Sequence, residues 1–319
     1  MRKALGLSLV ALAAMAATPA AAQADNFPSR TIRWVVPYAP GGPADFIARL
    51  VAQKLSERLG QTVIIDNKAG AAGDIGANDV IRAPADGYTM LYVNPFLITN
   101  PLSMKASKDL LGSLKPVILM TSVPMVLIRN PKFPATTFTE VLDAIKKKPG
   151  EVTCGSSGAM PMVGCRLLES VAGAEINSVI YRGQAPVVTA TMSGEINLAF
   201  DMSNTVTPYL EAKQVLPIAT TAAKREAARP DIPAIAESVD GVELIVWQGA
   251  MVAKDTPDAI VQKLNTEINA VLAIPEIRER VVKLGLTVDG GTPDAFATLI
   301  AKDKVRLTDL FKKAKIEPQ

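Results

Sequence analysis

The chain has 319 residues, with 34 lysines and arginines against 31 aspartates and glutamates, and it contains no histidine. The near balance of charge provides no electrostatic footprint for nucleic acid. The absence of histidine excludes Ser-His-Asp and Cys-His nucleophilic sites and removes the commonest zinc ligand. Because a chain of this length exceeds the size at which one core usually keeps growing, we expect two domains.

Residues 1–24 predict a cleaved signal peptide. A basic start is followed by the small apolar run Ala4–Ala17, and Ala22–Ala24 supplies the small residues that a signal peptidase reads. The apolar run breaks at Pro19, before it reaches the about 20 residues that a membrane anchor needs. We therefore expect a mature chain that begins at Asp25 and is exported.

Strand and helix patterns then alternate, which is typical of an α/β protein. A one-sided apolar pattern with a terminal glycine predicts a helix over Ala44–Gly60. The first part of the chain is predicted to be β-α-β-α-β, over Thr31–Tyr38, Ala44–Gly60, Gln61–Asn67, Gly73–Ala83 and Tyr88–Asn94.

The middle of the chain begins with two apolar runs separated by Pro124. Strands are then predicted over Glu151–Ser157, Ile176–Gly183, Glu195–Met202 and Val215–Thr221, and helices over Thr137–Gly150, Pro161–Gly173 and Ala185–Gly194. The chain returns through an apolar run, Val242–Ala253, and closes with helices over Pro257–Ala273, Pro275–Gly285 and Pro293–Lys315.

This order predicts two α/β lobes, each a mostly parallel sheet flanked by helices. One lobe is discontinuous and comprises residues 25–124 and 243–319, and the other comprises residues 125–242. Two chain crossings between lobes form a hinge, and hinge closure around a ligand is a recurrent mechanism. A cleft between domains is also a preferred site for a small molecule.

A glycine-rich turn, "PYAPGGPAD", joins the first predicted strand to the first helix. Ligands of open α/β sheets bind beyond the carboxyl ends of strands, where a helix start presents unpaired N–H groups and the positive end of its dipole. Gly41 and Gly42 leave the backbone accessible. Asp45 is expected to orient the loop or to contact a bound water. The turn lacks the Gly-Lys-Ser/Thr ending of a nucleotide P-loop.

A second turn of the same type, "CGSSGAMP", contains Ser156, Ser157 and Gly158. Its hydroxyl and free N–H groups suit a carboxylate, and the two turns could grip one anion from opposite lobes. Glycine-rich turns also occur between strands and helices that bind nothing, so a purely structural role remains the alternative. Met160 is either a core residue or an apolar wall of the pocket.

Other polar residues are predicted at strand ends, where cleft walls should lie. Asn94 follows the third strand, and Tyr181, Arg182 and Asp201 end strands of the middle segment. Arg182 is a suitable direct partner for a carboxylate, and a solvated surface cation is the alternative.

The two cysteines, Cys154 and Cys165, have two open interpretations. An exported protein can hold a disulfide, but Cys154 ends a strand and Cys165 lies about two turns into the next helix, whereas a disulfide needs Cβ atoms about 4 Å apart. Two buried free thiols are the alternative.

An enzyme that uses Ser156 or Ser157 as nucleophile would need an activating base. The sequence has no histidine for this role. We therefore expect no enzymatic activity, no cofactor and no metal.

An ordered series of motifs resembles the Bug family, the TctC-type extracytoplasmic solute receptors of tripartite tricarboxylate transporters. The motifs are the segment from "FPSRTIRWVVPYAPGGPAD" through "APADGYTML", then "GSSG", "YRGQAPVVTATMSGEINLAFD", "RPDIPAIAES" and "LGLTVDGGTPDAF". The resemblance covers essentially the whole mature chain. After "GSSG" many relatives carry polar residues and a histidine, whereas this chain reads "AMPMVG".

The resemblance implies a monomeric periplasmic solute-binding protein with a Venus-flytrap closure. Its ligand would be a small organic carboxylate, with an aromatic carboxylate and a dicarboxylate as the open alternatives, and its partner would be the membrane permease. A sensory receptor with the same fold is the alternative. Matching motifs place these residues in the pocket: Tyr38, Pro40, Gly41, Gly42, Asp45, Ser156, Ser157, Gly158, Tyr181, Arg182 and Asp201.

Overall fold

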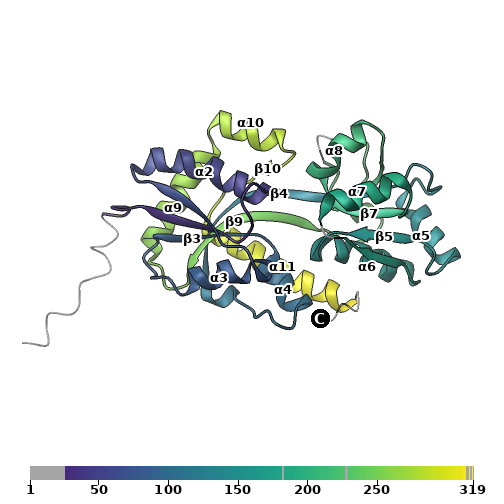
Figure 1. Cartoon of the computed structure of the whole chain (residues 1–319), viewed down its shortest axis with the longest axis horizontal. Coiled ribbons are helices and arrows are strands. Elements are labelled where there is room, and N and C mark those ends of the chain that lie inside the picture. The colour runs from purple at the N-terminus through teal and green to yellow at the C-terminus, as the bar shows by residue number, and fades with distance from the viewer. Residues whose placement is uncertain (1–25, 182, 227–228, 314–315, 317, 319) are drawn as a thin grey trace, which may run out of the picture.

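The computed structural model describes residues 26–181, 183–226, 229–313, 316 and 318. The predicted signal peptide, residues 1–24, lies outside the described residues. Two lobes lie side by side along the long axis of the molecule, and the strands β4 (Leu114–Arg129) and β9 (Ile245–Ala253) run between them (Figure 1). This two-lobed α/β arrangement confirms the predicted fold class.

The strands form a mixed sheet. Within the described residues their order is β2-β1-β3-β9-β4-β7-β5-β6, and β8 and β10 also pair with β4. The parallel pairs are those of β1 with β2 and β3, and of β5 with β6 and β7. Pairs that involve β4 or β9 are antiparallel, because these strands carry the chain between the lobes in opposite directions. The sheet is therefore less parallel than the sequence pattern indicated.

The remaining strands are β1 (Ile32–Val36), β2 (Val63–Asn67), β3 (Thr89–Val93), β5 (Thr153–Ser156), β6 (Asn177–Ile180), β7 (Leu198–Met202), β8 (Leu216–Thr220) and β10 (Thr287–Val288).

The strand β4 is continuous over 16 residues, although the sequence pattern indicated two runs separated by Pro124. Up to Pro124 it pairs with β9, and from Met125 it pairs with β7 and β8. Proline has no N–H to donate, and here it lies where the strand exchanges one partner for another. We propose that the lobes divide at this point, into a first lobe of residues 25–124 and 243–319 and a second lobe of residues 125–242.

Two helices, α4 and α8, were not predicted from the sequence. Each contains an internal proline, Pro101 or Pro208, which usually ends a helix. No helix in the described part of the chain is both long and apolar enough to cross a bilayer.

The helices are α2 (Pro43–Leu59), α3 (Asp74–Ile81), α4 (Phe96–Ser103), α5 (Phe138–Lys147), α6 (Ala159–Ala172), α7 (Gln184–Ser193), α8 (Ser203–Glu211), α9 (Asp258–Leu272), α10 (Pro275–Lys283) and α11 (Pro293–Lys313). Short 3-10 turns are η1 (Ala71–Gly73), η2 (Leu111–Ser113) and η3 (Ile235–Glu237).

The two faces of the sheet are packed differently. On the face that carries α3, α4, α6 and α11, at the bottom of Figure 1, one buried cluster runs through both lobes and includes Val93, Trp247 and Phe200. We call this the joined face. On the opposite face, a cluster under α2 and α9 is separate from a cluster under α7 and α8. We call this the divided face, because each lobe has its own core there.

Candidate functional site

The first turn joins β1 to α2. Gly42 is the N-cap residue of α2, and no described side chain caps the start of the helix. Pro43 occupies the first helical position and has no N–H, so the next donors are the amides of Ala44 and Asp45. A helix start whose amides are not satisfied by a cap offers hydrogen bonds and a positive dipole end to an anion.

Asp45 holds the first turn in place. Its Oδ2 accepts hydrogen bonds from the Gly41 amide and from Arg49 Nε, both at 2.9 Å, and its Oδ1 accepts one from Asn67 Nδ2 at 2.9 Å. Asn67 Nδ2 also donates to the Tyr38 carbonyl oxygen at 3.1 Å. The hydrogen bond from Arg49 lowers the pKa of the buried Asp45 carboxyl to about 2, with help from Gly41 and Asn67. The carboxylate is therefore ionised and fully engaged within the loop.

The two glycines of this turn have different roles. The Gly41 amide is engaged by Asp45, and its φ of +83° lies in the left-handed region that favours glycine. Gly42 has an extended backbone, and a Cβ built on it would meet only the Ala39 carbonyl oxygen, at 3.8 Å. Gly41 therefore fixes the shape of the turn, whereas Gly42 keeps its outer surface open.

Tyr38 and Asn94, which were predicted separately, lie together in the first lobe. Burial raises the pKa of Tyr38 well above its usual value, and the side-chain hydrogen bond with Asn94 acts in the opposite direction. Asn94 Oδ1 accepts from the Phe96 amide at 3.0 Å, and the rings of Tyr38 and Phe96 meet edge to face, with centroids 6.3 Å apart. The phenol is thus a neutral group beside the first turn.

The second turn joins β5 to α6 in the second lobe. Ser156 is buried, Ser157 is half-buried and Gly158 is exposed. Gly158 is the N-cap residue of α6, again with no capping side chain among the described residues, and no described atom lies within 4 Å of a Cβ built there. By contrast, α5 in the same lobe begins with a complete capping box formed by Thr137 and Glu140.

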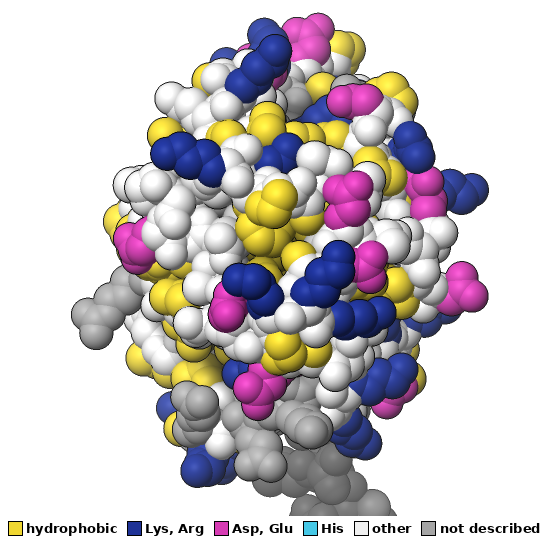
Figure 2. Space-filling model, turned by 90° about the vertical axis from the view of Figure 1, so that its right-hand side faces the viewer, with side chains coloured by type: hydrophobic (Ala, Val, Ile, Leu, Met, Phe, Trp, Pro, Cys, Tyr) yellow, Lys and Arg dark blue, Asp and Glu magenta, His cyan; other side chains and the backbone are white. Residues whose placement is uncertain are grey.

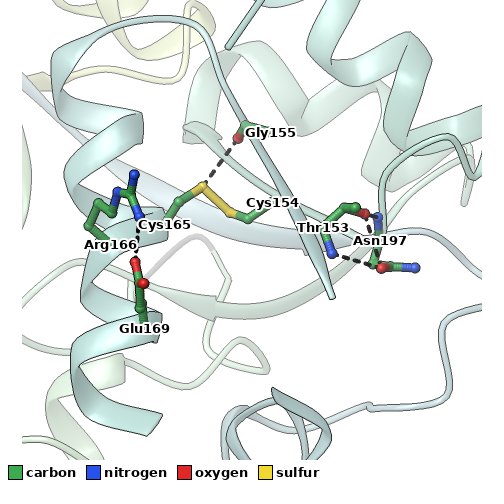
Figure 3. Close-up of a disulfide and its surroundings, with 7 residues drawn as sticks. All are labelled: Thr153, Cys154, Gly155, Cys165, Arg166, Glu169 and Asn197. Carbon is green, nitrogen blue, oxygen red and sulfur yellow. Dashed lines mark hydrogen bonds and ion pairs between the residues drawn. A yellow bond between two sulfur atoms is a disulfide. The ribbon is translucent and has the colours of Figure 1, made fainter. Parts of the chain in front are cut away.

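A disulfide connects the strand and the helix on either side of the second turn. Cys154 of β5 and Cys165 of α6 are bonded, with their Cα atoms 5.8 Å apart, and both side chains are fully buried (Figure 3). The sequence left this pairing open, and the structure contains the bond. Thr153 also anchors the start of β5, because its amide donates to Asn197 Oδ1 at 2.9 Å.

Tyr181 and Asp201 are engaged within the second lobe. The Tyr181 hydroxyl donates to Glu195 Oε1 at 2.8 Å, and burial together with Glu195 raises the pKa of Tyr181 to about 12. Asp201 has no exposed surface, and burial raises the pKa of its carboxyl to about 6. Its Oδ1 accepts from the Met202 amide at 2.7 Å, while Oδ2 has no hydrogen-bond partner among the described residues. Arg182 lies outside the described residues.

One cavity lies against the first turn. It has a volume of about 300 Å³, and its lining, which includes no residue of the second turn, consists of Gly41, Asp45, Phe46, Arg49, Leu50, Gln53 and Arg280. Two larger cavities, of about 550 and 590 Å³, lie beside α3 and α5. The convergence of both turns on one ligand therefore stays a prediction. Among the described residues, no cluster of three or more cysteines, aspartates or glutamates is arranged to hold a metal ion.

Arg49 and Asn67 support the first turn but were not predicted from the sequence. Arg49 lies four residues after Asp45 on α2, a spacing that brings side chains together on one helix face. Asn67 ends β2 and is in register with Val36 at the end of β1. The helical spacing of Arg49 was a usable signal, whereas the position of Asn67 depends on the strand pairing.

Known proteins resemble this chain over most of its length. A family model described as "Tripartite tricarboxylate transporter family receptor" matches residues 47–316. The structure of Rpa4515 from R. palustris with adipate is 32% identical, with a TM-score of 0.79, and the match covers 92% of this chain and 100% of that one.

Two further solved structures are similar. The periplasmic binding protein BugD is 31% identical, with a TM-score of 0.74 and coverage of 92% of this chain and 100% of BugD. MatC from Rhodopseudomonas palustris, solved with bound malate, is 27% identical, with a TM-score of 0.73 and coverage of 89% of this chain and 100% of MatC.

Proposed function

Because the chain belongs to the TctC family of tripartite tricarboxylate transporter receptors, we propose that it captures a small organic carboxylate between its lobes and delivers it to the permease of such a transporter. The resemblance found in the sequence is confirmed by the family match and by the likeness to BugD. The family and its solved members are solute-binding receptors, so the chain is a solute-binding protein and not an enzyme.

The observation that carries the proposal is the pair of uncapped helix starts. At α2 and α6 no described side chain caps the first-turn amides. The helices α3, α4 and α7 to α10 also lack a side-chain cap within the described part of the chain, but α2 and α6 follow the two glycine turns, one in each lobe, and have open space beside Gly42 and Gly158. Free amides at a helix start bind anions. One such start in each lobe fits a ligand with two carboxylates, and adipate and malate, found in two relatives, are both dicarboxylates.

The side chains then have distinct roles in the proposed site. Amides of the first turn and the neutral Tyr38 phenol contact one end of the ligand, while Asp45 keeps the turn in shape without touching the anion. The Ser157 hydroxyl and the amides at the start of α6 contact the other end. Asn94 positions the Tyr38 phenol through the hydrogen bond between their side chains. Pro40, Ser156, Tyr181, Arg182 and Asp201 stay predicted contacts on the basis of the family motifs.

The test replaces the open glycines with valine. Gly42→Val and Gly158→Val should fold, because both positions have extended backbones and room for a side chain. Each valine would cover amides that bind the anion, so we expect affinity for adipate or malate, measured by calorimetry, to fall at least about tenfold. Gly112→Val is the matched control, since no described atom lies within 4 Å of a Cβ there.

The ligand class is tested on wild-type protein stripped of bound solute. A ligand that binds the folded state raises the melting temperature by mass action, so we expect a rise with at least one of a panel of mono-, di- and aromatic carboxylates. The diamide of adipate should have no effect, because it lacks the charge. If no carboxylate raises the melting temperature, the proposal is wrong.

Export and delivery complete the proposed function. We expect the protein recovered from the periplasm to begin at Asp25, which mass spectrometry of the intact protein measures. Uptake of the ligand into vesicles that contain the permease should require the receptor. Ligand binding without such uptake, together with control of a membrane kinase, would instead favour the sensory alternative.

A further inference from the structure

The divided face contains a close contact between the two lobes. Gly285 lies in the turn between α10 and β10 of the first lobe, and Asn204 is the second residue of α8 in the second lobe. A Cβ built on Gly285 would lie 2.9 Å from Asn204 Cβ and 3.0 Å from Asn204 Cα. Contacts below 3.0 Å are essentially absent from real Cβ atoms. The absence of a side chain at position 285 is therefore what lets the lobes approach this closely.

The Gly285 turn is fixed in position on the first lobe. The Gly285 amide donates to the Val282 carbonyl oxygen at 2.8 Å, and the Leu286 amide donates to the Val281 carbonyl oxygen at 3.3 Å. Gly285 has a φ of +71°, which favours glycine. Immediately afterwards β10 pairs with β4. The turn is thus held between a helix end and a strand that crosses between the lobes.

The start of α8 faces the first lobe. Met202, which precedes the helix, packs against the joined cluster and also against the first-lobe cluster of the divided face. The Asn204 side-chain Oδ1 is buried and has no hydrogen-bond partner among the described residues. On the divided face the lobes thus meet through Met202 and the start of α8, while the two buried clusters of that face remain separate.

We propose that the contact between Gly285 and the start of α8 is a latch that sets how far the two lobes close. The joined face shares one core and acts as the fixed side of the hinge. The divided face has separate cores and can open, and the latch forms when it shuts. The link to ligand retention rests on the proposed function, whereas the contact itself can be tested without any ligand.

A cysteine pair tests the contact directly. In the double variant Gly285→Cys and Asn204→Cys, opening by about 1 Å brings the Cβ atoms to the separation of about 4 Å that a disulfide needs. We expect the pair to cross-link under mild oxidation, as measured by the mass of the thiol-blocked protein. Gly291→Cys with Asn204→Cys is the control, because Gly291 also has a positive φ but no described atom lies within 4 Å of its Cβ position. Failure of the Gly285 pair to cross-link would overturn the proposal, whether or not a carboxylate binds.

A second pair of variants separates the latch from simple backbone strain. Gly285→Ala and Gly60→Ala place alanine at similar φ angles, +71° and +63°, but position 60 has open space. If adipate or malate binds the wild type, we expect Gly285→Ala to weaken that binding at least about tenfold more than Gly60→Ala. Adding Asn204→Gly should recover part of the loss, because it removes the nearest atom. Equal affinities in the two alanine variants would show that closure does not depend on this contact.

Discussion

The two strand-to-helix turns are held in place by different forces. The first turn depends on hydrogen bonds and an ion pair around Asp45, whose partner Arg49 is 52% exposed. The second turn lies between a buried strand and helix that are joined by the disulfide of Cys154 and Cys165. Polar contacts at a surface are weakened by salt and by a change of pH, whereas a covalent bond is not. The two halves of one proposed site should therefore respond to different conditions.

Close packing adds to the rigidity of the second turn. A Cβ built on Gly164 of α6 would lie 2.6 Å from the ring of Phe200 in β7. The helix that follows the second turn therefore sits directly on the sheet, without an intervening side chain. At the first turn, by comparison, Phe46 is exposed, and a Cβ built on the half-buried Gly42 would meet only a backbone oxygen, at 3.8 Å. We therefore expect the first turn to be less rigid than the second.

Removal of the disulfide should have the largest effect on stability. Cys154→Ala with Cys165→Ala opens a short loop, and the loss of such a bond costs about 3 kcal/mol of the free energy of unfolding. Denaturant titration of the oxidised proteins measures the change. Reduction of the wild type should produce a similar loss, while the variant should not respond to reductant. If the variant is as stable as the oxidised wild type, the disulfide does not stabilise the second turn.

Loss of the Asp45 network should have the next largest effect. Asp45→Ala leaves the Gly41 amide, Arg49 and Asn67 without their shared acceptor, so we expect the free energy of unfolding to fall by about 2 kcal/mol. Glu276→Ala is the control, because its ion pair with Arg280 is largely exposed and such pairs contribute under about 1 kcal/mol. If both variants lose the same amount, Asp45 does not hold the turn.

The pH dependence of stability should have opposite signs at the two carboxyls. The folded-state pKa of Asp45 is lowered to about 2, so its contribution is present above its ordinary pKa and is lost as the pH falls toward 2. The folded-state pKa of Asp201 is raised to about 6 by burial, so the stability it supplies at low pH is lost as the pH rises through 6.

Asp201→Asn isolates the effect of the raised pKa. The amide cannot ionise, so we expect the variant to be more stable than the wild type at pH 8, where the wild-type carboxylate is ionised in a buried site, and to show no gain at pH 4. Urea titrations at the two pH values measure the difference. A gain of the same size at both pH values would mean that ionisation of Asp201 is not its cause.

The strand-to-helix turns and the helices that follow them could be predicted from local sequence patterns. The periodicity of α2 and the glycines of both turns were sufficient to place the strand-to-helix junctions. The helices α4 and α8 were not predicted because each contains a proline, Pro101 or Pro208, and a proline usually ends a helix. The continuity of β4 through Pro124 was missed because it depends on a change of pairing partner.

Contacts between segments that are far apart in the chain could not be predicted from the sequence. The bond between Cys154 and Cys165 depends on the angle at which α6 leaves β5. The support that Asn67 gives to the first turn depends on the pairing of β1 with β2. The Gly285 contact depends on the relative placement of the lobes, which no local pattern encodes.

Hydrogen–deuterium exchange on the ligand-stripped protein, with and without saturating adipate or malate, tests the central claim most directly. The account predicts that one ligand slows amide exchange in both turns, at Ala44 and Asp45 in the first lobe and at Ala159 and Met160 in the second. A bound dicarboxylate that protects amides of only one turn, or of neither, would contradict it.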